Sequence, residues 1–171
     1  MAGTGRRSYI QREGRLVTEW VTTHFPAAHV AYRVRLGAID VTLADSQLTE
    51  RELRAIGIIR RYVDALVITD RDVHLVEGKI LEPTRAIVQL DLYERLFPLT
   101  PGYEQYRTRP IVKDLVWVIP DPVVEQLARE RGILVHLFHP EWIDPYLAEV
   151  RPNERTATHP AGLLPLGGEA T

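Results

Sequence analysis

The chain has 171 residues, a length that fits one domain with a single core. Hydrophobic residues make up 45% and charged residues 26%, so the composition favours a soluble globular protein over a disordered or fibrous one. The absence of cysteine excludes disulfides, thiolate zinc sites and cysteine nucleophiles. No apolar run approaches the roughly 20 residues that cross a bilayer. We therefore expect a cytoplasmic protein without a membrane partner, located in the host cytoplasm or the virion if it is viral.

The distribution of basic residues says more than the formal net charge of -2. Only two of the 21 basic residues are lysines, Lys79 and Lys113. The arginines cluster at Arg6, Arg7, Arg12, Arg15, Arg33, Arg35, Arg60 and Arg61. Such clusters suit phosphate binding, although surface arginines are also common as simple solvated groups. From them we predict nucleic-acid contacts at Arg12, Arg15, Arg60 and Arg61.

The first third of the chain predicts a helix followed by a strand. Apolar residues recur at three- and four-residue spacing over 9–24, which is typical of an amphipathic helix, and Pro26 ends it. Residues 29–36 alternate apolar and polar side chains, which predicts a strand that continues into 38–43. A capping-box pattern at 49–52 predicts a short helix to about residue 56.

The central third predicts a hairpin and then alternating helices and strands. Two strands, 61–68 and 73–79, flank a polar turn at 69–72. Pro83 opens the helix that follows. The later elements are a helix over 84–97, a loop over 99–110, a buried strand over 111–119, a helix over 122–131 and a strand over 133–138.

This order of elements predicts an α/β fold with a mixed central β-sheet flanked by helices. We expect a single domain over 1–150, because the pattern of elements has no long interruption. Residues 151–171 contain proline, glycine and polar residues without periodicity, so we expect a tail. Such a tail could order against a partner in a homo-oligomer or a larger assembly.

The hairpin places acidic residues opposite each other. If the turn is centred between Asp70 and Arg71, positions whose numbers sum to 141 face each other, and Asp64 and Glu77 form such a pair. Directly opposed residues have β-carbons about 4.5 to 5.5 Å apart. Two like charges within a buried sheet call for a cation or a shared proton. The sequence therefore predicts a divalent-metal site at this pair.

Mg²⁺ fits this site because it prefers oxygen ligands, and Mn²⁺ should substitute for it. The side chain of Lys79 emerges on the same face as Glu77, because side chains alternate along a strand. The carbonyl of Gly78 supplies a further oxygen ligand. If the site catalyses phosphoryl transfer, the ammonium of Lys79 would orient or help deprotonate the attacking water. It would also offset the charge on the phosphorus atom.

The Asp-x12-Glu-x-Lys spacing on a hairpin resembles the PD-(D/E)xK nuclease superfamily, with Val63 at the proline position of the motif's name. Gln89 and Tyr93 match the Gln-x3-Tyr motif of its RecB-like branch. The resemblance implies a restriction-endonuclease-like core and a Mg²⁺-dependent deoxyribonuclease, endonuclease or exonuclease. It also implies that Asp64, Glu77, Lys79, Gln89 and Tyr93 belong to the catalytic site.

The same resemblance implies a further metal-site carboxylate from the first helix, and Glu13 is the candidate, because it lies in the apolar stripe whereas Glu19 points away. The predicted metal ligands are thus Asp64, Glu77, Glu13 and the Gly78 carbonyl.

Several alternatives remain open. The acidic pair could be a solvated sheet face, and Asp40 could replace Asp64 as the metal ligand. His136 and His139 could suggest zinc, but their i,i+3 spacing at a strand end puts them on opposite faces, which favours ordinary packing. The rival function is a nuclease-fold protein that binds nucleic acid or other subunits without cutting. A third is a metal hydrolase of smaller phosphoesters.

Overall fold

The computed structural model describes residues 4–37 and 62–150, and side chains from residue 11 onward. Several predictions lie outside these ranges, namely the strand at 38–43, the helix at 49–56, Asp40, Arg60, Arg61 and the tail at 151–171. The chain divides into two compact units, Met1–His139 and Pro140–Thr171. No helix within the described ranges is long and apolar enough to span a membrane.

The first unit is built on a five-stranded sheet in the order β1-β2-β3-β4-β5. The strands are β1 (His29–Arg35), β2 (Tyr62–Ile68), β3 (Val73–Lys79), β4 (Ile111–Trp117) and β5 (Ile133–Leu137). The first three strands pair antiparallel, whereas β3, β4 and β5 pair parallel. The prediction of an α/β fold with a mixed central sheet is therefore confirmed, and this arrangement is compatible with a restriction-endonuclease-like core.

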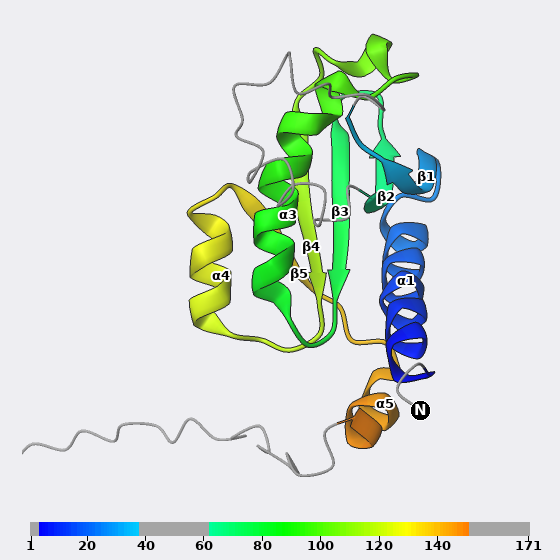
Figure 1. The fold of residues 1–171 in the computed structure, drawn as a ribbon, viewed down its shortest axis with the longest axis vertical. Coiled ribbons are helices and arrows are strands. Elements are labelled where there is room, and N and C mark those ends of the chain that lie inside the picture. Colours follow the sequence, from blue (N-terminus) through cyan, green and yellow to red (C-terminus); the bar gives the residue numbers. More distant parts are fainter. Residues whose placement is uncertain (1–3, 38–61, 151–171) are drawn as a thin grey trace, which may run out of the picture. The chain divides into compact units, whose positions relative to one another are not determined.

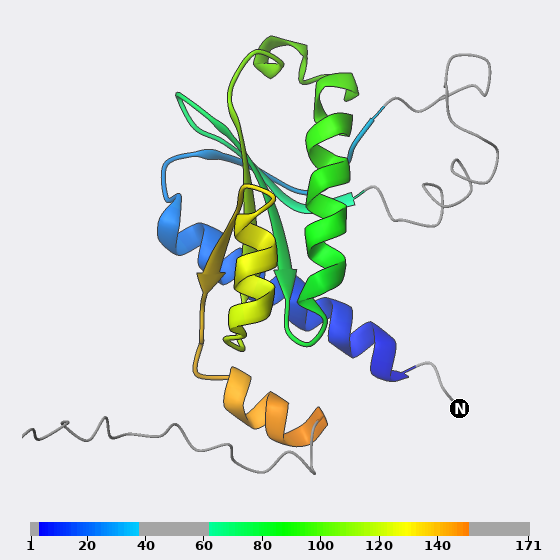
Figure 2. The same ribbon diagram turned by 90° about the vertical axis from the view of Figure 1, so that its left-hand side faces the viewer.

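Helices cover both faces of the sheet (Figures 1 and 2). On one face, α1 (Thr4–His24) packs against β2, β3 and β4. On the other, α3 (Pro83–Leu96) packs against β3 and β4, with α4 (Pro122–Arg129) beside it against β5. Each helix buries an apolar stripe against the sheet, as the spacing of its apolar residues predicts. The central strand β3 is therefore enclosed on both faces.

The predicted elements of this unit agree with the structure at their ends to within a few residues. The helix predicted from residue 9 begins earlier, at Thr4, and still ends at His24 before Pro26. Two short 3-10 helices follow α3, namely η1 (Phe97–Leu99), at the end of the predicted helix, and η2 (Glu104–Tyr106), within the predicted loop at 99–110. In the second unit, the helix α5 (Ile143–Val150) was not predicted. Its Pro145 suggests a helix breaker, but it falls in the first turn, where proline is tolerated.

The strand β4 differs from the continuous apolar run that the sequence suggested, because two charged residues lie in its middle. Lys113 and Asp114 are both buried, and adjacent strand residues point to opposite faces of a sheet. Lys113 pairs with Asp91 and Glu94 of α3, at 2.9 and 2.8 Å. Ion pairing thus anchors α3 to the sheet in addition to apolar packing.

Candidate active site

The β2–β3 hairpin has the register that the sequence predicts. Its pairs run from Ile68 opposite Val73 to Ala65 opposite Val76, so that paired numbers sum to 141. One further step along the strands places Asp64 opposite Glu77. At this step the Oδ2 of Asp64 accepts a hydrogen bond of 3.1 Å from the backbone N–H of Gly78. The two predicted metal ligands thus lie next to each other at the end of the hairpin.

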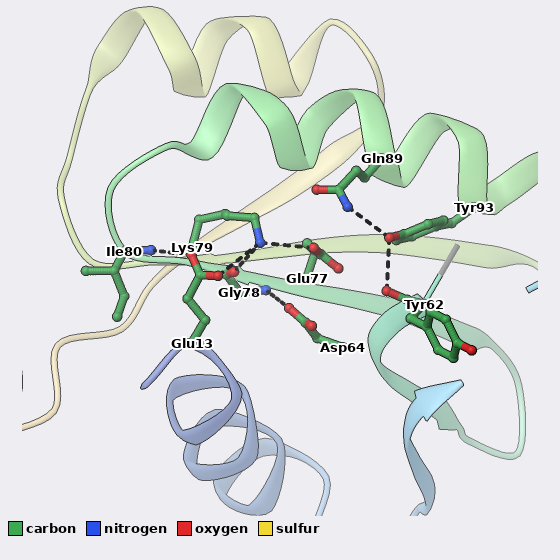
Figure 3. Close-up of polar contacts among 9 residues, drawn as sticks. All are labelled: Glu13, Tyr62, Asp64, Glu77, Gly78, Lys79, Ile80, Gln89 and Tyr93. Carbon is green, nitrogen blue, oxygen red and sulfur yellow. Dashed lines mark hydrogen bonds and ion pairs between the residues drawn. The ribbon is translucent and has the colours of Figure 1, made fainter. Parts of the chain in front are cut away.

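The ammonium of Lys79 joins the acidic groups around it (Figure 3). Its Nζ lies 3.0 Å from Oε1 of Glu77, which confirms that both side chains occupy one face of β3. It also donates to the carbonyl oxygen of Gly78 at 2.9 Å and lies 3.4 Å from Oε2 of Glu13. Lys79 therefore contacts three of the groups that the sequence predicts as metal ligands.

Glu13 reaches the site from α1. Its side chain is buried, and Oε1 accepts a hydrogen bond of 3.4 Å from the backbone N–H of Ile80 while Oε2 faces Lys79. The other acidic residue of this helix, Glu19, pairs instead with exposed Arg15 at 2.7 Å. The prediction that Glu13 faces the sheet and Glu19 points away is therefore confirmed.

Gly78 is required by the packing of α1 on β3. A β-carbon built at this position would lie 2.4 Å from Cγ2 of Val17 and 3.2 Å from the backbone oxygen of Glu13. Any side chain would therefore push α1 away from the strand. The close approach brings Glu13 within reach of Lys79. Gly78 therefore shapes the site by lacking a side chain, whether or not its carbonyl binds a metal.

Glu77 is a deeply buried carboxyl group of the site with a strongly raised pKa. It is 3% exposed, and its Oε2 is fully buried without a hydrogen-bond partner among the described residues. Burial, reinforced by the nearby charge of Asp64, raises the pKa of Glu77 to about 8, against the opposing effect of Lys79. At neutral pH and without a cation, this carboxyl group therefore holds a proton.

Asp64 and Lys79 are shifted by the same surroundings. Burial raises the pKa of Asp64, although Lys79, the Gly78 N–H and the charge of Arg33 partly oppose the shift. Burial alone would lower the pKa of Lys79, but the charges of Glu77, Glu13 and Asp64 outweigh it and raise that pKa. Lys79 is therefore a cation at any physiological pH.

Gln89 and Tyr93 lie over the site from one face of α3, as their spacing predicts (Figure 3). Nε2 of Gln89 donates to the Tyr93 hydroxyl at 3.1 Å, and that hydroxyl donates to the backbone oxygen of Tyr62 at 3.0 Å. The pKa of Tyr93 is raised by burial and then by the charges of Glu77 and Asp64. Oε1 of Gln89 is buried without a hydrogen-bond partner. The pair therefore ties α3 to the start of β2, close to Asp64.

The arrangement supplies oxygen ligands but does not form a finished metal centre. Within residues 4–37 and 62–150, no three His, Asp or Glu side chains are grouped so that they could hold a metal ion. Lys79 contacts both Glu13 and Glu77, so its ammonium balances charge that a cation would otherwise balance. The chemistry available is a set of hard carboxylate oxygens beside a fixed ammonium, which suits Mg²⁺ better than zinc.

The predicted nucleic-acid contacts are only partly described. Arg15 is exposed and pairs with Glu19, and Arg12 is half-buried on the same helix. Arg60 and Arg61 lie outside the described residues. Contacts of these four arginines with nucleic acid remain predictions.

A buried cluster on the α1 face was not predicted from the sequence. Asp114 accepts hydrogen bonds from His74 at 2.8 Å and from His136 at 2.7 Å. Burial opposes ionisation of this carboxyl group, but the two hydrogen bonds outweigh it and lower the pKa of Asp114. The signal was an aspartate in the middle of an apolar strand, which requires buried partners. His139 contacts the backbone oxygen of Val118 instead, so His136 and His139 share no site.

A pocket of about 540 Å³ lies at the opposite end of the hairpin from the acidic site. Its lining includes Thr69 and Asp70 of the turn, and Tyr106 and Arg109 of the following loop. The guanidinium of Arg109 is held by the backbone oxygen of Thr69 and stacks over the Tyr106 ring at 4.9 Å. This pocket therefore presents no carboxylate cluster comparable to that around Glu77.

No protein-family model matches the chain, and no curated protein is significantly similar to it. The resemblance to the PD-(D/E)xK superfamily therefore rests on the residues and the geometry described above.

Proposed function

We propose that this protein is a divalent-metal-dependent nuclease that hydrolyses phosphodiester bonds in DNA. One observation carries the proposal, which is that Asp64, Glu77 and Lys79 meet at the end of one hairpin with Oε2 of Glu77 buried and unpartnered. A buried carboxylate oxygen without a partner is costly unless a proton or a cation satisfies it. Without a metal, a proton meets that need at neutral pH, and a bound cation would replace this proton and bind the ionised carboxylate.

The donors fit Mg²⁺ or Mn²⁺, because they are carboxylate oxygens from Asp64, Glu77 and Glu13, with the Gly78 carbonyl alongside. When bound, such an ion polarises a phosphate oxygen and makes a bound water more acidic. Lys79 is held cationic by its neighbours, so it acts as a hydrogen-bond donor to the water or to the charge that develops on phosphorus. It is poorly suited to remove a proton, because its raised pKa opposes the neutral form. Gln89 and Tyr93 steady the adjacent strand.

Purified full-length protein tests this proposal directly. Single- and double-stranded DNA and RNA are incubated with Mg²⁺, with Mn²⁺ or with EDTA, using wild type, Asp64→Asn and Glu77→Gln. We expect DNA cleavage by wild type only when a metal is present, and none by either variant. Cleavage that persists in EDTA or in both variants would contradict the proposed site.

A second candidate is a nuclease-fold subunit that binds nucleic acid or other subunits without cutting. The observation that favours it is the contact of Lys79 with both Glu77 and Glu13, which already balances acidic charge within the site. For this candidate, wild type would cleave none of the four nucleic acids. Its melting temperature would also not respond to Mg²⁺ or Mn²⁺.

A further inference from the structure

Two arginines flank the acidic site from different elements. Arg33 lies on the edge strand β1, between the pairs Tyr32–Ala65 and Val34–Val63, which places it opposite Asp64. Arg85 lies in the first turn of α3, four residues before Gln89 and eight before Tyr93, so that all three share one helix stripe. Arg33 therefore lies opposite one carboxylate of the site, on the β1 side, and Arg85 lies on the α3 stripe that carries Gln89 and Tyr93 over the site.

Both guanidinium groups are exposed. In the part of the chain that the structure describes, neither forms a hydrogen bond or an ion pair with another residue. By contrast, Lys113 of β4 contacts Asp91, and Arg15 of α1 contacts Glu19. The two arginines thus keep all their donors available for an external anion.

The backbone at Arg33 supports a role other than sheet formation. Its φ is 54°, in the left-handed region that side chains other than glycine, asparagine and aspartate rarely adopt. It is the only non-glycine residue with positive φ in the described ranges, and it breaks the run of paired residues between β1 and β2. Strain of this kind persists where the surrounding structure and the function require it.

The electrostatic influence of both arginines extends to the groups of the site. Burial dominates at Asp64 and at Tyr93 and raises both pKa values, but the charge of Arg33 lowers the pKa of Asp64 and that of Arg85 lowers the pKa of Tyr93. A phosphate held by Arg33 would therefore lie close to Asp64, and one held by Arg85 would lie close to Tyr93.

We propose that Arg33 and Arg85 bind backbone phosphates on the two sides of the scissile phosphate. The substrate of this site is then an extended polynucleotide strand rather than a small phosphoester. This inference rests on the proposed nuclease function and adds the residues that select its substrate. Arginine suits the role because its planar fork can bind phosphate in a bidentate manner.

The test compares an oligonucleotide of about 20 nucleotides with bis(p-nitrophenyl) phosphate, a diester that carries a single phosphate. Arg33→Gly removes the guanidinium and suits the positive φ, and Arg85→Ala removes the other group. We expect each variant to raise KM for the oligonucleotide about tenfold with a smaller effect on kcat. The decrease in kcat/KM should be several-fold smaller for bis(p-nitrophenyl) phosphate.

Binding without cleavage provides a second readout, with the oligonucleotide and the protein in EDTA or Ca²⁺. Removing one arginine–phosphate interaction should lower the salt dependence of affinity by roughly 0.7 in slope for a single strand. Arg95→Ala on the same helix and Arg129→Ala on α4 are matched controls, because both arginines are exposed and lie off the Gln89–Tyr93 stripe. These controls should leave KM and the salt slope unchanged.

Each outcome decides a different point. The inference would be overturned if wild type, Arg33→Gly and Arg85→Ala bound the oligonucleotide with equal affinity and equal salt slope. Cleavage by wild type would in that case still support the proposed nuclease function. Hydrolysis of bis(p-nitrophenyl) phosphate without oligonucleotide binding would also overturn it. Arginine-dependent binding by a wild type that never cuts would uphold the two phosphate interactions and overturn the catalytic function.

Discussion

Lys79 contacts only one of the two carboxylate oxygens of Glu77. Its Nζ lies 3.0 Å from Oε1, while Oε2 is buried and has no hydrogen-bond partner. The ion pair therefore satisfies half of the carboxylate, and the other half needs a proton or a cation. This asymmetry distinguishes the pair from a buried salt bridge that is complete in itself, and the metal ion that we propose would satisfy the second oxygen.

Replacing Lys79 by Ala should lower the rate of DNA cleavage by about 100- to 1,000-fold, because the variant lacks the ammonium that we propose stabilises charge in the transition state. DNA affinity should change little, since the substitution is expected to affect the catalytic rate rather than binding. Lys113→Ala is the matched control, because Lys113 is the other lysine and is also buried among acidic partners. Both variants should melt at lower temperature than wild type, but Lys113→Ala should still cut below its melting point. Equal loss of cleavage in both variants would indicate damage to the fold.

Replacing Asp64 by Asn should make the metal-free protein at least as stable as wild type. The substitution removes one of two neighbouring acidic groups, and the amide oxygen can still accept the hydrogen bond from Gly78. Thermal melting in EDTA should therefore show an unchanged or higher melting temperature. The rise in melting temperature on adding Mg²⁺ should disappear in this variant.

The exposed turn residue Asp70 provides the control for this experiment. Asp70→Asn should keep the metal-dependent rise in melting temperature. If Asp64→Asn keeps that rise as well, Asp64 is not a metal ligand.

Much of this hairpin could be predicted from the sequence, because its register depends on local features. The polar turn at 69–72 and the alternation of side chains fix which residues oppose each other. The contact of Glu13 with Lys79 spans 66 positions and could be anticipated only through the resemblance to a nuclease family. Local periodicity shows that a helix face is buried, but not which strand it meets.

The parts of the fold that were not predicted have long-range or conformational causes. The position of Asp114 within an apolar strand indicates that it needs buried partners, but its bonds to His74 and His136 span 40 and 22 positions, so no local pattern identifies these partners. The positive φ of Arg33 gives no signal, because arginine carries no marked preference for that backbone conformation. Helix α5 has only eight residues and carries Pro145 in its first turn, so its sequence gives a weak helix signal.

Glu77 makes the stability of the metal-free protein depend on pH. Its pKa rises from an ordinary 4.5 to about 8 on folding, so the folded state binds more protons than the unfolded state between these values. The stabilisation is complete below about pH 4.5 and is lost as pH rises through 8. Denaturant unfolding in EDTA should therefore show stability falling from pH 6 to pH 9.

Glu77→Gln is the control for that pH profile, because an amide cannot titrate. Its free energy of unfolding should fall less between pH 6 and pH 9 than that of wild type. Adding Mg²⁺ should also flatten the wild-type profile, since a bound cation favours the ionised carboxylate. Identical profiles for wild type and Glu77→Gln in EDTA would contradict the raised pKa.

Asp114 should make the stability of the protein depend on pH in the acidic range. Its burial favours the protonated form, but hydrogen bonds from His136 and His74 outweigh that effect and lower its pKa from 3.8. A carboxylate with a lowered pKa stabilises the fold above its unfolded value, and that contribution is lost as pH falls through the folded value. Asp114→Asn should therefore be less stable than wild type at pH 7 and lose less stability on acidification below pH 4. Asp70→Asn should follow the wild-type acid profile in the same unfolding measurements.

The packing of α1 on Gly78 predicts a coupled pair of substitutions. Gly78→Ala should destabilise the protein by about 1–3 kcal/mol, because the new methyl group would lie 2.4 Å from Cγ2 of Val17. It should also weaken cleavage, since Glu13 moves with the helix. Val17→Ala removes that methyl contact, so the double variant should be more stable than the sum of the single effects implies.

Gly14→Ala is the reference for adding a methyl group near the same helix turn, because a β-carbon there would meet no atom within 4 Å. It should raise stability by about 0.5–1 kcal/mol through the helix preference of alanine. Denaturant unfolding of the four variants measures the coupling between Gly78 and Val17. If the effects of Gly78→Ala and Val17→Ala on the free energy of unfolding are additive, α1 does not pack directly on Gly78. The position of Glu13 beside Lys79 would then need another explanation.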